Sequence, residues 1–322
     1  MKSLFCIITI YLLLSYGNGE IMRVAGGQPV KEGEYKYFIQ LLVAHYVFNN
    51  TSPGFVYCGA SLIHRNWILT AAQCFKIHRM IPPQMFTDGW VRAYTGNKKV
   101  TSIQIHNPAF IFQNVSRAHL HPRYTFKGTG KNPPVEYDVA VAKLAKPFER
   151  NVKTIHLPLG ANTQLCTVAT IIGAGLINSK DFPELVQYSR TRIKTRNQLS
   201  IKPPYDYPAI FYSEVVWAEG HPWLSDTGGP VVCNNLGYSV QHGVTSLVRK
   251  YNRTVISQYE RVKNHIAFIK QHVPLGSSRK KRGHIKKKSK NLEEEVKSTS
   301  LQRKSSFICI CVNVILYLKG NF

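Results

Sequence analysis

The chain has 322 residues, of which 44% are hydrophobic and 18% are charged. This composition is typical of a packed globular protein and excludes a fully disordered one. Lys and Arg number 42 against 17 Asp and Glu, so the formal net charge is +25, which favours anionic partners or surfaces. No segment reaches the roughly 20 consecutive apolar residues that a membrane-spanning helix needs, so no transmembrane span is expected.

The first residues have the pattern of a secretory signal peptide over positions 1–19. Lys2 supplies the positive charge, residues 4–14 are nearly all apolar, and residues 15–19 are small and polar. We therefore expect a secreted, extracellular protein with a short propeptide over residues 20–23. Secretion also places the chain where disulfides form and persist.

The last residues, 275–322, are predicted to be a basic and disordered tail. Like charges at 279–282 and 286–288 repel one another and stay solvated. The first of these runs is either a furin-type processing site or a plain basic run. An apolar stretch at 307–318 is too short to span a bilayer and is either part of a cleaved lipid-anchor signal or an appended tail.

The body between these ends, residues 24–274, is predicted to be β-rich. It keeps 28 basic and 13 acidic residues, a formal charge of +15. Short runs rich in β-branched and aromatic residues recur between turn residues, at 37–43, 57–63, 67–70, 139–144, 168–172, 229–233, 238–248 and 254–259. No helix-length periodic segment separates them, which argues against an alternating α/β fold.

One helix is predicted at the end of the body. Val262, Ile266, Ile269 and Val273 follow one another at i, i+4, i+7 and i+11, which places them on one helix face. We expect this face to dock on the β-structure, with a partner-binding helix as the alternative. The fold class is therefore all-β with a C-terminal α-helix.

Three segments carry a family resemblance: residues 58–74, which run from Cys58 to Cys74, residues 137–144, and residues 225–230. Their order and spacing resemble those of the chymotrypsin/trypsin-like (S1) serine proteases. Residues 23–27 resemble that family's activation site, and residues 259–272 resemble its C-terminal strand and helix. The resemblance implies two six-stranded antiparallel β-barrels over residues 24–274, with the site in the cleft between them.

The chemistry of that family does not carry over residue by residue. Acyl transfer by a hydroxyl needs a nucleophile, a base that takes its proton and an orienting carboxylate. By the resemblance, these positions are Thr227, Gln73 and Asp138. A primary amide cannot hold a proton near neutral pH, and the methyl group of threonine restricts its side chain. His64 and His78 are near Gln73 in sequence, but we do not expect either to replace the base.

We therefore predict that no catalytic residue is functional. The amide of Gln73 could donate a hydrogen bond to Asp138 and accept one from Thr227, which would keep a bonded network without catalysis.

The positions that form the substrate pocket in the family also differ. Ser225 stands where the family has a glycine that supplies an oxyanion amide, and His221 stands where trypsin-like pockets carry an aspartate. The Ser-Trp-Gly segment that forms one wall of the pocket in the family is replaced here by residues 246–248, which begin with Ser246 and end with Val248. Trp223 stands where the family has a cysteine of a disulfide near the pocket. No pocket for Arg or Lys side chains is predicted.

The resemblance also implies an activation step. Cleavage after Arg23 would release the amine of Val24, which would form a buried ion pair with Asp226 and order the surrounding loops. The alternative is that Asp226 remains only as a core residue.

The resemblance further implies two disulfides, Cys58–Cys74 and an inter-barrel bridge Cys166–Cys233. Candidate N-glycosylation sites are Asn50 (whose triplet overlaps that of Asn49), Asn114 and Asn252. No Cys/His spacing typical of zinc occurs, and no metal or other cofactor is expected.

Three functions follow, in order of preference. The first is a secreted protease homologue without proteolytic activity. It would act as a cofactor, decoy or regulator of extracellular proteolysis by binding extracellular proteins such as proteases or their inhibitors. The second is a cationic binder of anionic glycans or microbial surfaces. The third is an active serine endopeptidase with atypical catalysis. No nucleic-acid motif is present, and a nucleic-acid partner is not expected.

Overall fold

The computed structural model describes residues 27–46, 53–76, 86–87, 89–101, 107–126, 134–149, 151–160, 163–176, 182–203, 206–217, 219–235 and 237–275. The predicted signal peptide, the activation residues Arg23 and Val24, His78, Asn50 and nearly all of the basic tail lie outside these ranges.

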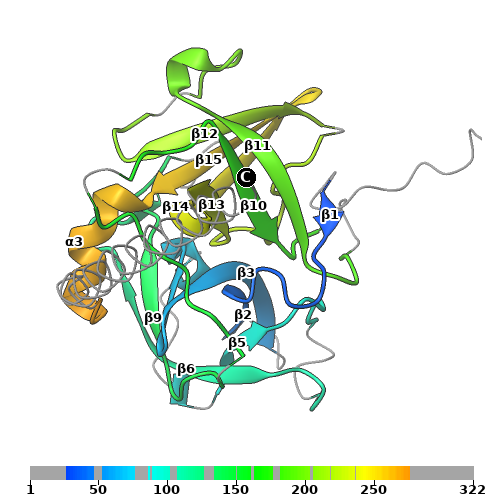
Figure 1. Ribbon diagram of the computed structural model, residues 1–322, viewed down its shortest axis with the longest axis vertical. Helices are drawn as coiled ribbons and strands as arrows, with labels where there is room; N and C mark the ends of the chain where they lie inside the picture. Colours follow the sequence, from blue (N-terminus) through cyan, green and yellow to red (C-terminus); the bar gives the residue numbers. More distant parts are fainter. Residues whose placement is uncertain are drawn as a thin grey trace, which may run out of the picture. The chain divides into compact units, whose positions relative to one another are not determined.

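The first barrel contains six antiparallel strands and closes in the order β2-β3-β4-β9-β6-β5 (Figure 1). These strands are β2 (Phe38–Tyr46), β3 (Pro53–His64), β4 (Trp67–Thr70), β5 (Val91–Thr95), β6 (Phe112–Leu120) and β9 (Ala140–Leu144). All four residues of β4 are buried, as its apolar composition predicts. The short 3-10 helix η1 (Ala72–Phe75) follows β4 and carries the first site residue.

The second barrel is built from the strands that follow in sequence. Its sheet runs β1-β11-β10-β13-β14-β15-β12, and a further pairing of β11 with β12 closes six of these strands into a barrel. The strands are β1 (Gln28–Pro29), β10 (Val168–Gly173), β11 (Gln187–Lys194), β12 (Ile210–Val216), β13 (Pro230–Asn235), β14 (Tyr238–Tyr251) and β15 (Thr254–Arg261). The prediction of two six-stranded antiparallel barrels is thereby confirmed.

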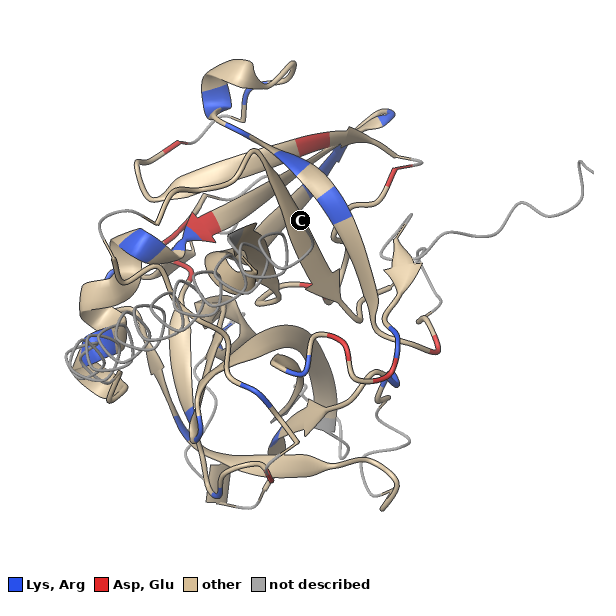
Figure 2. Cartoon of the chain, viewed as in Figure 1, with Lys and Arg blue, Asp and Glu red and all other residues tan. Residues whose placement is uncertain are grey.

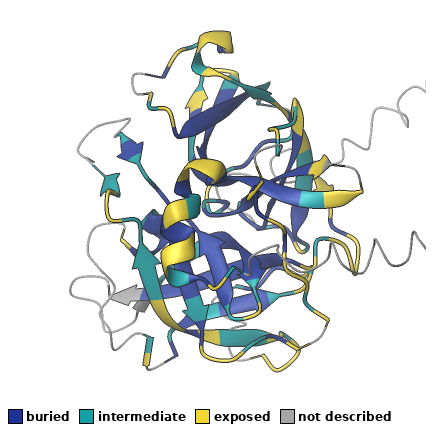
Figure 3. Cartoon of the chain, turned by 60° about the vertical axis from the view of Figure 1, so that its left-hand side comes forward, coloured by how far each residue is buried: buried dark blue, intermediate teal, exposed yellow. Residues whose placement is uncertain are grey.

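The interior of the second barrel is a cluster of apolar side chains from alternate strand positions. Its fully enclosed members include Ile171, Phe211, Val231 and Tyr259. Figure 3 shows that buried residues are concentrated in the strands of both barrels, whereas exposed residues lie mainly in turns, at strand ends and on the helix. Three short elements complete the description: the strands β7 (Thr125–Phe126) and β8 (Val135–Glu136), which pair with each other, and the 3-10 helix η3 (Arg196–Gln198).

The predicted C-terminal helix is present as α3 (Val262–His272). It ends before Pro274, as expected because a proline disfavours the helical conformation of the residue that precedes it. The ring of Phe268 contacts the ring of His121 at 5.0 Å between centroids, so the helix packs against the chain just after β6. One detail of the predicted face was wrong: Ile266 is only half-buried, whereas Phe268 is buried.

Each of the eight predicted β-runs lies on a strand, but β5, β6, β11 and β12 were not predicted. Both β6 and β11 consist mostly of polar residues, so neither contains the apolar run on which the prediction relied. The N-terminal part of β12 is apolar and aromatic and could have been recognised.

Both predicted disulfides are present. Cys58 in β3 is bonded to Cys74 in η1. Cys166 is bonded to Cys233 in β13, and both residues pack in or against the core of the second barrel. The expectation that this second bridge joins the two barrels was therefore wrong. Within the described ranges, no helix is both long and apolar enough to cross a membrane.

Candidate functional site

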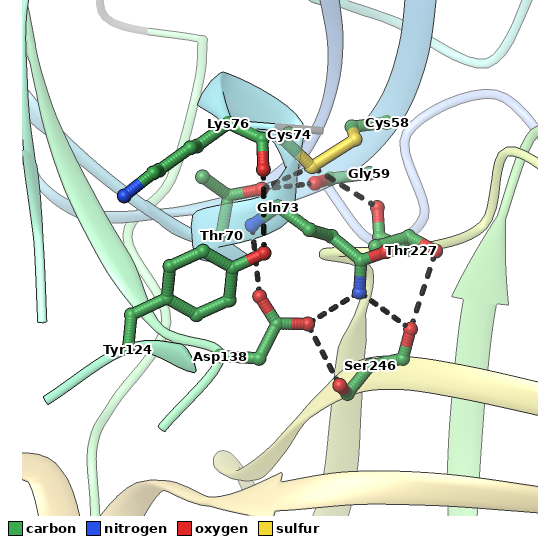
Figure 4. Close-up of a disulfide and its surroundings, with 10 residues drawn as sticks. All are labelled: Cys58, Gly59, Thr70, Gln73, Cys74, Lys76, Tyr124, Asp138, Thr227 and Ser246. Carbon is green, nitrogen blue, oxygen red and sulfur yellow. Dashed lines mark hydrogen bonds between the residues drawn. A yellow bond between two sulfur atoms is a disulfide. The ribbon is translucent and has the colours of Figure 1, made fainter. Parts of the chain in front are cut away.

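The residues at the three triad-equivalent positions meet where the two barrels face each other (Figure 4). Gln73 lies in η1 after β4, and Asp138 precedes β9, so both belong to the first barrel. Thr227 precedes β13, and Ser246 lies in β14 of the second barrel. The register of β14 against β15 shifts between Thr245 and Leu247, which makes Ser246 the bulged residue. Bulges commonly re-aim a side chain or carbonyl beside a functional site.

Asp138 is the centre of this site and is completely buried, with 0% of its surface exposed. Its Oδ1 accepts the backbone N–H of Gln73 at 2.8 Å. Its Oδ2 accepts the side-chain amide of Gln73 at 2.5 Å and the hydroxyl of Ser246 at 2.7 Å. Three donors therefore hold the carboxylate in a fixed orientation, which is how a buried charge remains tolerable.

The amide of Gln73 uses both of its N–H donors. One is directed to Asp138, and the other reaches the backbone oxygen of Ser246 at 2.9 Å. The predicted donation to Asp138 is confirmed. The predicted acceptance from Thr227 was wrong, because the Thr227 hydroxyl is directed at the same Ser246 oxygen, at 3.4 Å. The bulge at Ser246 places that oxygen within reach of both side chains.

No described residue offers the hydroxyl of Thr227 a proton acceptor with the chemistry of a base. Among the described residues, its hydroxyl contacts only the Ser246 carbonyl oxygen, and a carbonyl does not take up a proton near neutral pH. His64 does not reach this site: its Nδ1 accepts the backbone N–H of Asn66. The arrangement can hold the two barrels in register, but it provides no general base in the described ranges.

A second buried hydrogen-bond network, centred on Glu260, holds the backbone of Asp138. The backbone N–H of Asp138 donates to Glu260 Oε1 at 3.1 Å, and the hydroxyl of Tyr207 donates to the same carboxylate. His265 in α3 lies 3.0 Å from Glu260 Oε2. Sequence reasoning missed these residues. A signal was available, since Glu260 is a lone acidic residue directly after an apolar strand pattern.

Burial raises the pKa of Asp138 to about 6. The bonds from Ser246 and Gln73 act in the opposite direction, and the nearby charge of Glu260 adds to the increase. Asp138 thus remains ionised at neutral pH but is protonated at mildly acidic pH.

Asp226 is enclosed in a cradle of backbone atoms and is 2% exposed. Its Oδ1 accepts the N–H of Gly175 at 2.6 Å, and its Oδ2 accepts the N–H of Trp223 at 2.8 Å. A side chain at Gly173 would lie 2.0 Å from Oδ1, so only glycine fits there. Burial raises the pKa of Asp226 to about 6, while these bonds and the charge of Lys99 lower it.

The backbone next to Asp226 keeps an unusual conformation. Ser225 has φ 73°, in the left-handed region that normally favours glycine. Within the described ranges, the N–H groups of Ser225 and Thr227 donate no hydrogen bond. The sequence left the orientation of the Ser225 amide open, and the structure shows that the glycine-like conformation is kept at the expense of backbone strain.

Aromatic side chains gather at the pocket-equivalent positions. His221 is completely buried, and its Nδ1 lies 2.7 Å from the backbone oxygen of Glu219. Trp217 contacts His221 at 5.0 Å and Trp223 at 4.7 Å between ring centroids. Lys250 lies 3.6 Å above the Trp217 ring. Burial lowers the pKa of His221, which keeps this ring neutral.

The remaining predicted sites are placed as follows. Val248 is half-buried, whereas Ser246 is buried. Asn114 in β6 and Asn252, in the turn between β14 and β15, are both exposed. In the part of the chain that the structure describes, no group of three or more His, Cys, Asp or Glu residues could hold a metal ion.

Comparison with known proteins agrees with this geometry. The trypsin family model matches residues 24–269, so the chain belongs to the trypsin family. The chain is 24% identical to Serine protease 28 of Mus musculus over 274 residues, which is 81% of this chain and 92% of that protein. It is 26% identical to a trypsin of Xenopus laevis over 254 residues, covering 77% and 89% of the two chains. It is 25% identical to Trypsin II-P29 of Gallus gallus over 280 residues, covering 84% and 98%.

Proposed function

We propose that this protein is a secreted member of the trypsin family that lacks proteolytic activity and acts by binding. Its role would be that of a cofactor, decoy or regulator of extracellular proteolysis, with proteases or their inhibitors as partners. The observation that carries the proposal is the hydrogen bonding of the Gln73 side-chain amide. This amide occupies the position of the base, and both of its N–H donors are bound to Asp138 and Ser246.

The chemistry of these groups supports inactivity. Loss of one triad member in a serine protease costs several orders of magnitude in rate, about 10⁴-fold or more. Here the base position is an amide and the nucleophile position is a threonine whose hydroxyl faces a carbonyl oxygen. Serine protease 28 and the trypsin of Xenopus laevis are named as proteases, and the proposed loss of activity concerns the residues that this chain has at positions 73 and 227.

The geometry also supports a role in binding. A hydrogen-bonded network joins the two barrels through Gln73, Asp138 and Ser246. The fold is therefore held together at this site by residues that do not form a catalytic triad. Loops on such a rigid scaffold are the usual place for recognition. The aromatic cluster around Trp217 would close the pocket to the long basic side chains that trypsin-like pockets accept.

The test is covalent labelling with a fluorophosphonate probe, which reacts with activated serine and threonine hydroxyls. We expect no labelling of the full chain and labelling of the Gln73→His/Thr227→Ser double variant. That result would mean that the scaffold is intact and that only the chemistry has been lost. Labelling of the unchanged chain would overturn the proposal in favour of atypical catalysis. If neither protein is labelled, the strained Ser225 amide or the closed pocket also prevents reaction.

A second candidate function is binding of anionic glycans, and one surface favours it. Arg190 and Arg192 are exposed on the same outer face of β11. Figure 2 shows Lys and Arg residues along this strand in blue. Alternate residues of a strand lie about 7 Å apart, and the residues opposite these two on β10 are Thr170 and Val168. Lys194, on the same strand, forms an ion pair with Glu214.

Heparin chromatography tests this candidate. We expect the full chain to elute at higher salt than the Arg190→Ser/Arg192→Ser variant, because salt screens exposed charges. The matched control is Arg65→Ser/Arg253→Ser, which removes the same charge from two exposed positions elsewhere. Equal shifts for both variants would mean that only net charge matters and would reject β11 as a specific surface.

A further inference from the structure

Lys99 is the most deeply buried lysine or arginine in the described ranges, with 6% of its surface exposed. Its ammonium nitrogen lies 4.3 Å from the centre of the Phe182 ring and 4.7 Å from the centre of the Tyr57 ring. These distances are typical of cation–π contacts. No carboxylate oxygen of a described residue lies within 4.0 Å of this nitrogen. Among the described residues, the cation thus contacts aromatic faces and no carboxylate.

The backbone around Lys99 is held from two sides. The side chain of Gln40 donates to the backbone oxygen of Lys98 at 2.6 Å and accepts the N–H of Val100 at 2.9 Å. The N–H of Lys99 itself donates to the backbone oxygen of Glu184 at 2.9 Å. The side chain of Lys99 therefore projects from a fixed segment, which is the condition for a preorganised site.

Lys99 lines a cavity with a volume of about 570 Å³. The cavity's apolar wall comes from Ala109, Phe110, Phe182 and Pro183. Phe110 is anchored, because it packs on the buried cluster that includes Tyr94 and Val100. A cavity of this size that combines an apolar wall with a few charged groups is typical of small-molecule sites. Residues 102–106 and 177–181, next to the lining residues in sequence, lie outside the described ranges.

The charges around the cavity favour an anion. Among the described residues that line it, Lys98 and Lys99 are the cations and Glu184, which is exposed, is the carboxylate. Asp226 acts on Lys99 through space, but its two oxygens already accept N–H bonds from Gly175 and Trp223. The ammonium of Lys99 therefore retains its capacity for a direct ionic contact.

We propose that this cavity binds a small organic anion with an apolar body. Its carboxylate would lie against the ammonium of Lys99, and its ring or chain against Phe110 and Phe182. A charge-assisted hydrogen bond inside an apolar wall is stronger than one exposed to water. The site is separate from Gln73 and Asp138, and the proposal does not depend on whether the protein is catalytically active.

The affinity should depend on pH. Burial lowers the pKa of Lys99 to about 7, and the charge of Asp226 partly offsets this effect. The groups that face Lys99 are Asp226, Lys98, Glu184 and the ring of Tyr57. Because the ammonium loses its proton as the pH rises, an anion should bind more tightly at about pH 6 than at about pH 8.5.

The experiment is fluorine NMR titration of the full chain with 4-fluorophenylacetate and, separately, with the neutral 4-fluorophenylacetamide. We expect the acid to bind at least about tenfold more tightly than the amide at about pH 6. The Lys99→Met variant should lose at least about tenfold in affinity for the acid. The Glu184→Gln variant, which removes the carboxylate among the described lining residues, should gain about threefold.

Two controls keep the outcome interpretable. Lys270→Met removes the same charge from an exposed position on α3 and should leave the affinity unchanged. Glu184→Gln changes an exposed residue, so it still tests the proposal if Lys99→Met fails to fold. Equal affinity for the acid and the amide, absence of binding by both probes, or an unchanged affinity in Glu184→Gln would each overturn the proposal.

Discussion

At the scale of single residues, the site is defined by which hydrogen-bond donors surround Asp138. The amide of Gln73 supplies a donor where a catalytic site would need a proton acceptor, and Ser246 supplies a second donor. A carboxylate that is 0% exposed needs such donors, because an unsatisfied buried charge is strongly destabilising. Gln73 therefore has a structural role that does not require catalysis.

Removal of this amide should destabilise the protein. We expect Gln73→Ala to lower the free energy of unfolding by about 1–3 kcal/mol, because Asp138 and the Ser246 oxygen would each lose a donor. Urea unfolding of the full chain measures this change. The control Gln271→Ala, at an exposed position on α3, should stay within about 0.5 kcal/mol of the unchanged chain. Equal stability of the two variants would mean that the network does not stabilise the fold.

The pKa of Asp138 predicts a pH dependence of stability. Burial raises this pKa from 3.8 in the unfolded chain to about 6 in the folded one, so the folded state binds the proton more tightly. The resulting stabilisation is fully present below about pH 4 and is lost as the pH rises through about 6, with a total of about 3 kcal/mol.

Unfolding measured between about pH 3.5 and about pH 7 tests this dependence. The Asp138→Asn variant should lose less stability over that range than the unchanged chain. The exposed control Glu149→Gln should keep the original profile. A profile of Asp138→Asn that parallels the unchanged chain would contradict the assigned direction.

At the scale of elements, both disulfides fix segments that carry site residues. Cys58–Cys74 ties β3 to η1, which holds Gln73, and spans 16 residues. Cys166–Cys233 ties the segment before β10 to β13, which follows Thr227, and spans 67 residues. The entropy that a bridge removes from the unfolded chain grows with the length of the loop that it closes.

The longer bridge should therefore stabilise the fold more. We expect Cys166→Ser/Cys233→Ser to lower the free energy of unfolding by about 4 kcal/mol and Cys58→Ser/Cys74→Ser by about 3 kcal/mol. Chemical unfolding of the two double variants side by side provides the comparison. A larger loss of stability on removal of Cys58–Cys74 than of Cys166–Cys233 would show that the entropy of the unfolded chain is not the main origin of the stabilisation.

At the scale of the whole molecule, the sequence predicts a change of state on cleavage after Arg23. The amine released at Val24 would form an ion pair with the buried carboxylate of Asp226. The positive charge of Lys99 already lowers the pKa of this carboxylate. An ion pair formed there would add to the N–H bonds from Gly175 and Trp223.

We expect protein cleaved after Arg23 to unfold at a higher temperature and to resist proteolysis longer than intact protein, because a buried ion pair orders the segments around it. The control is an Asp226→Asn variant, in which cleavage should have no such effect. Identical profiles for the cleaved and intact forms of the unchanged chain would reject the switch.

Much of this protein follows from local sequence. The apolar run of β4 and the periodic face of α3 each predict a structure, because each is a property of neighbouring residues. The bridge between Cys58 and Cys74 was predicted from the family resemblance. The identity of Gln73 and Thr227 likewise argued against catalysis before any geometry was known. The mostly polar strands β6 and β11 escaped prediction, because neither contains an apolar run and each forms by pairing with a neighbouring strand of its barrel.

Only the tertiary structure decided which groups meet. The bulge at Ser246 places its oxygen within reach of both Gln73 and Thr227, so each side chain donates to that oxygen and the predicted bond between them does not form. The burial of Lys99 between Tyr57 and Phe182 likewise depends on the packing of segments that are distant in sequence. The physical reason is the same in both cases. Sequence fixes what each side chain can donate, accept or carry, whereas the distances across and between barrels decide which partners it reaches.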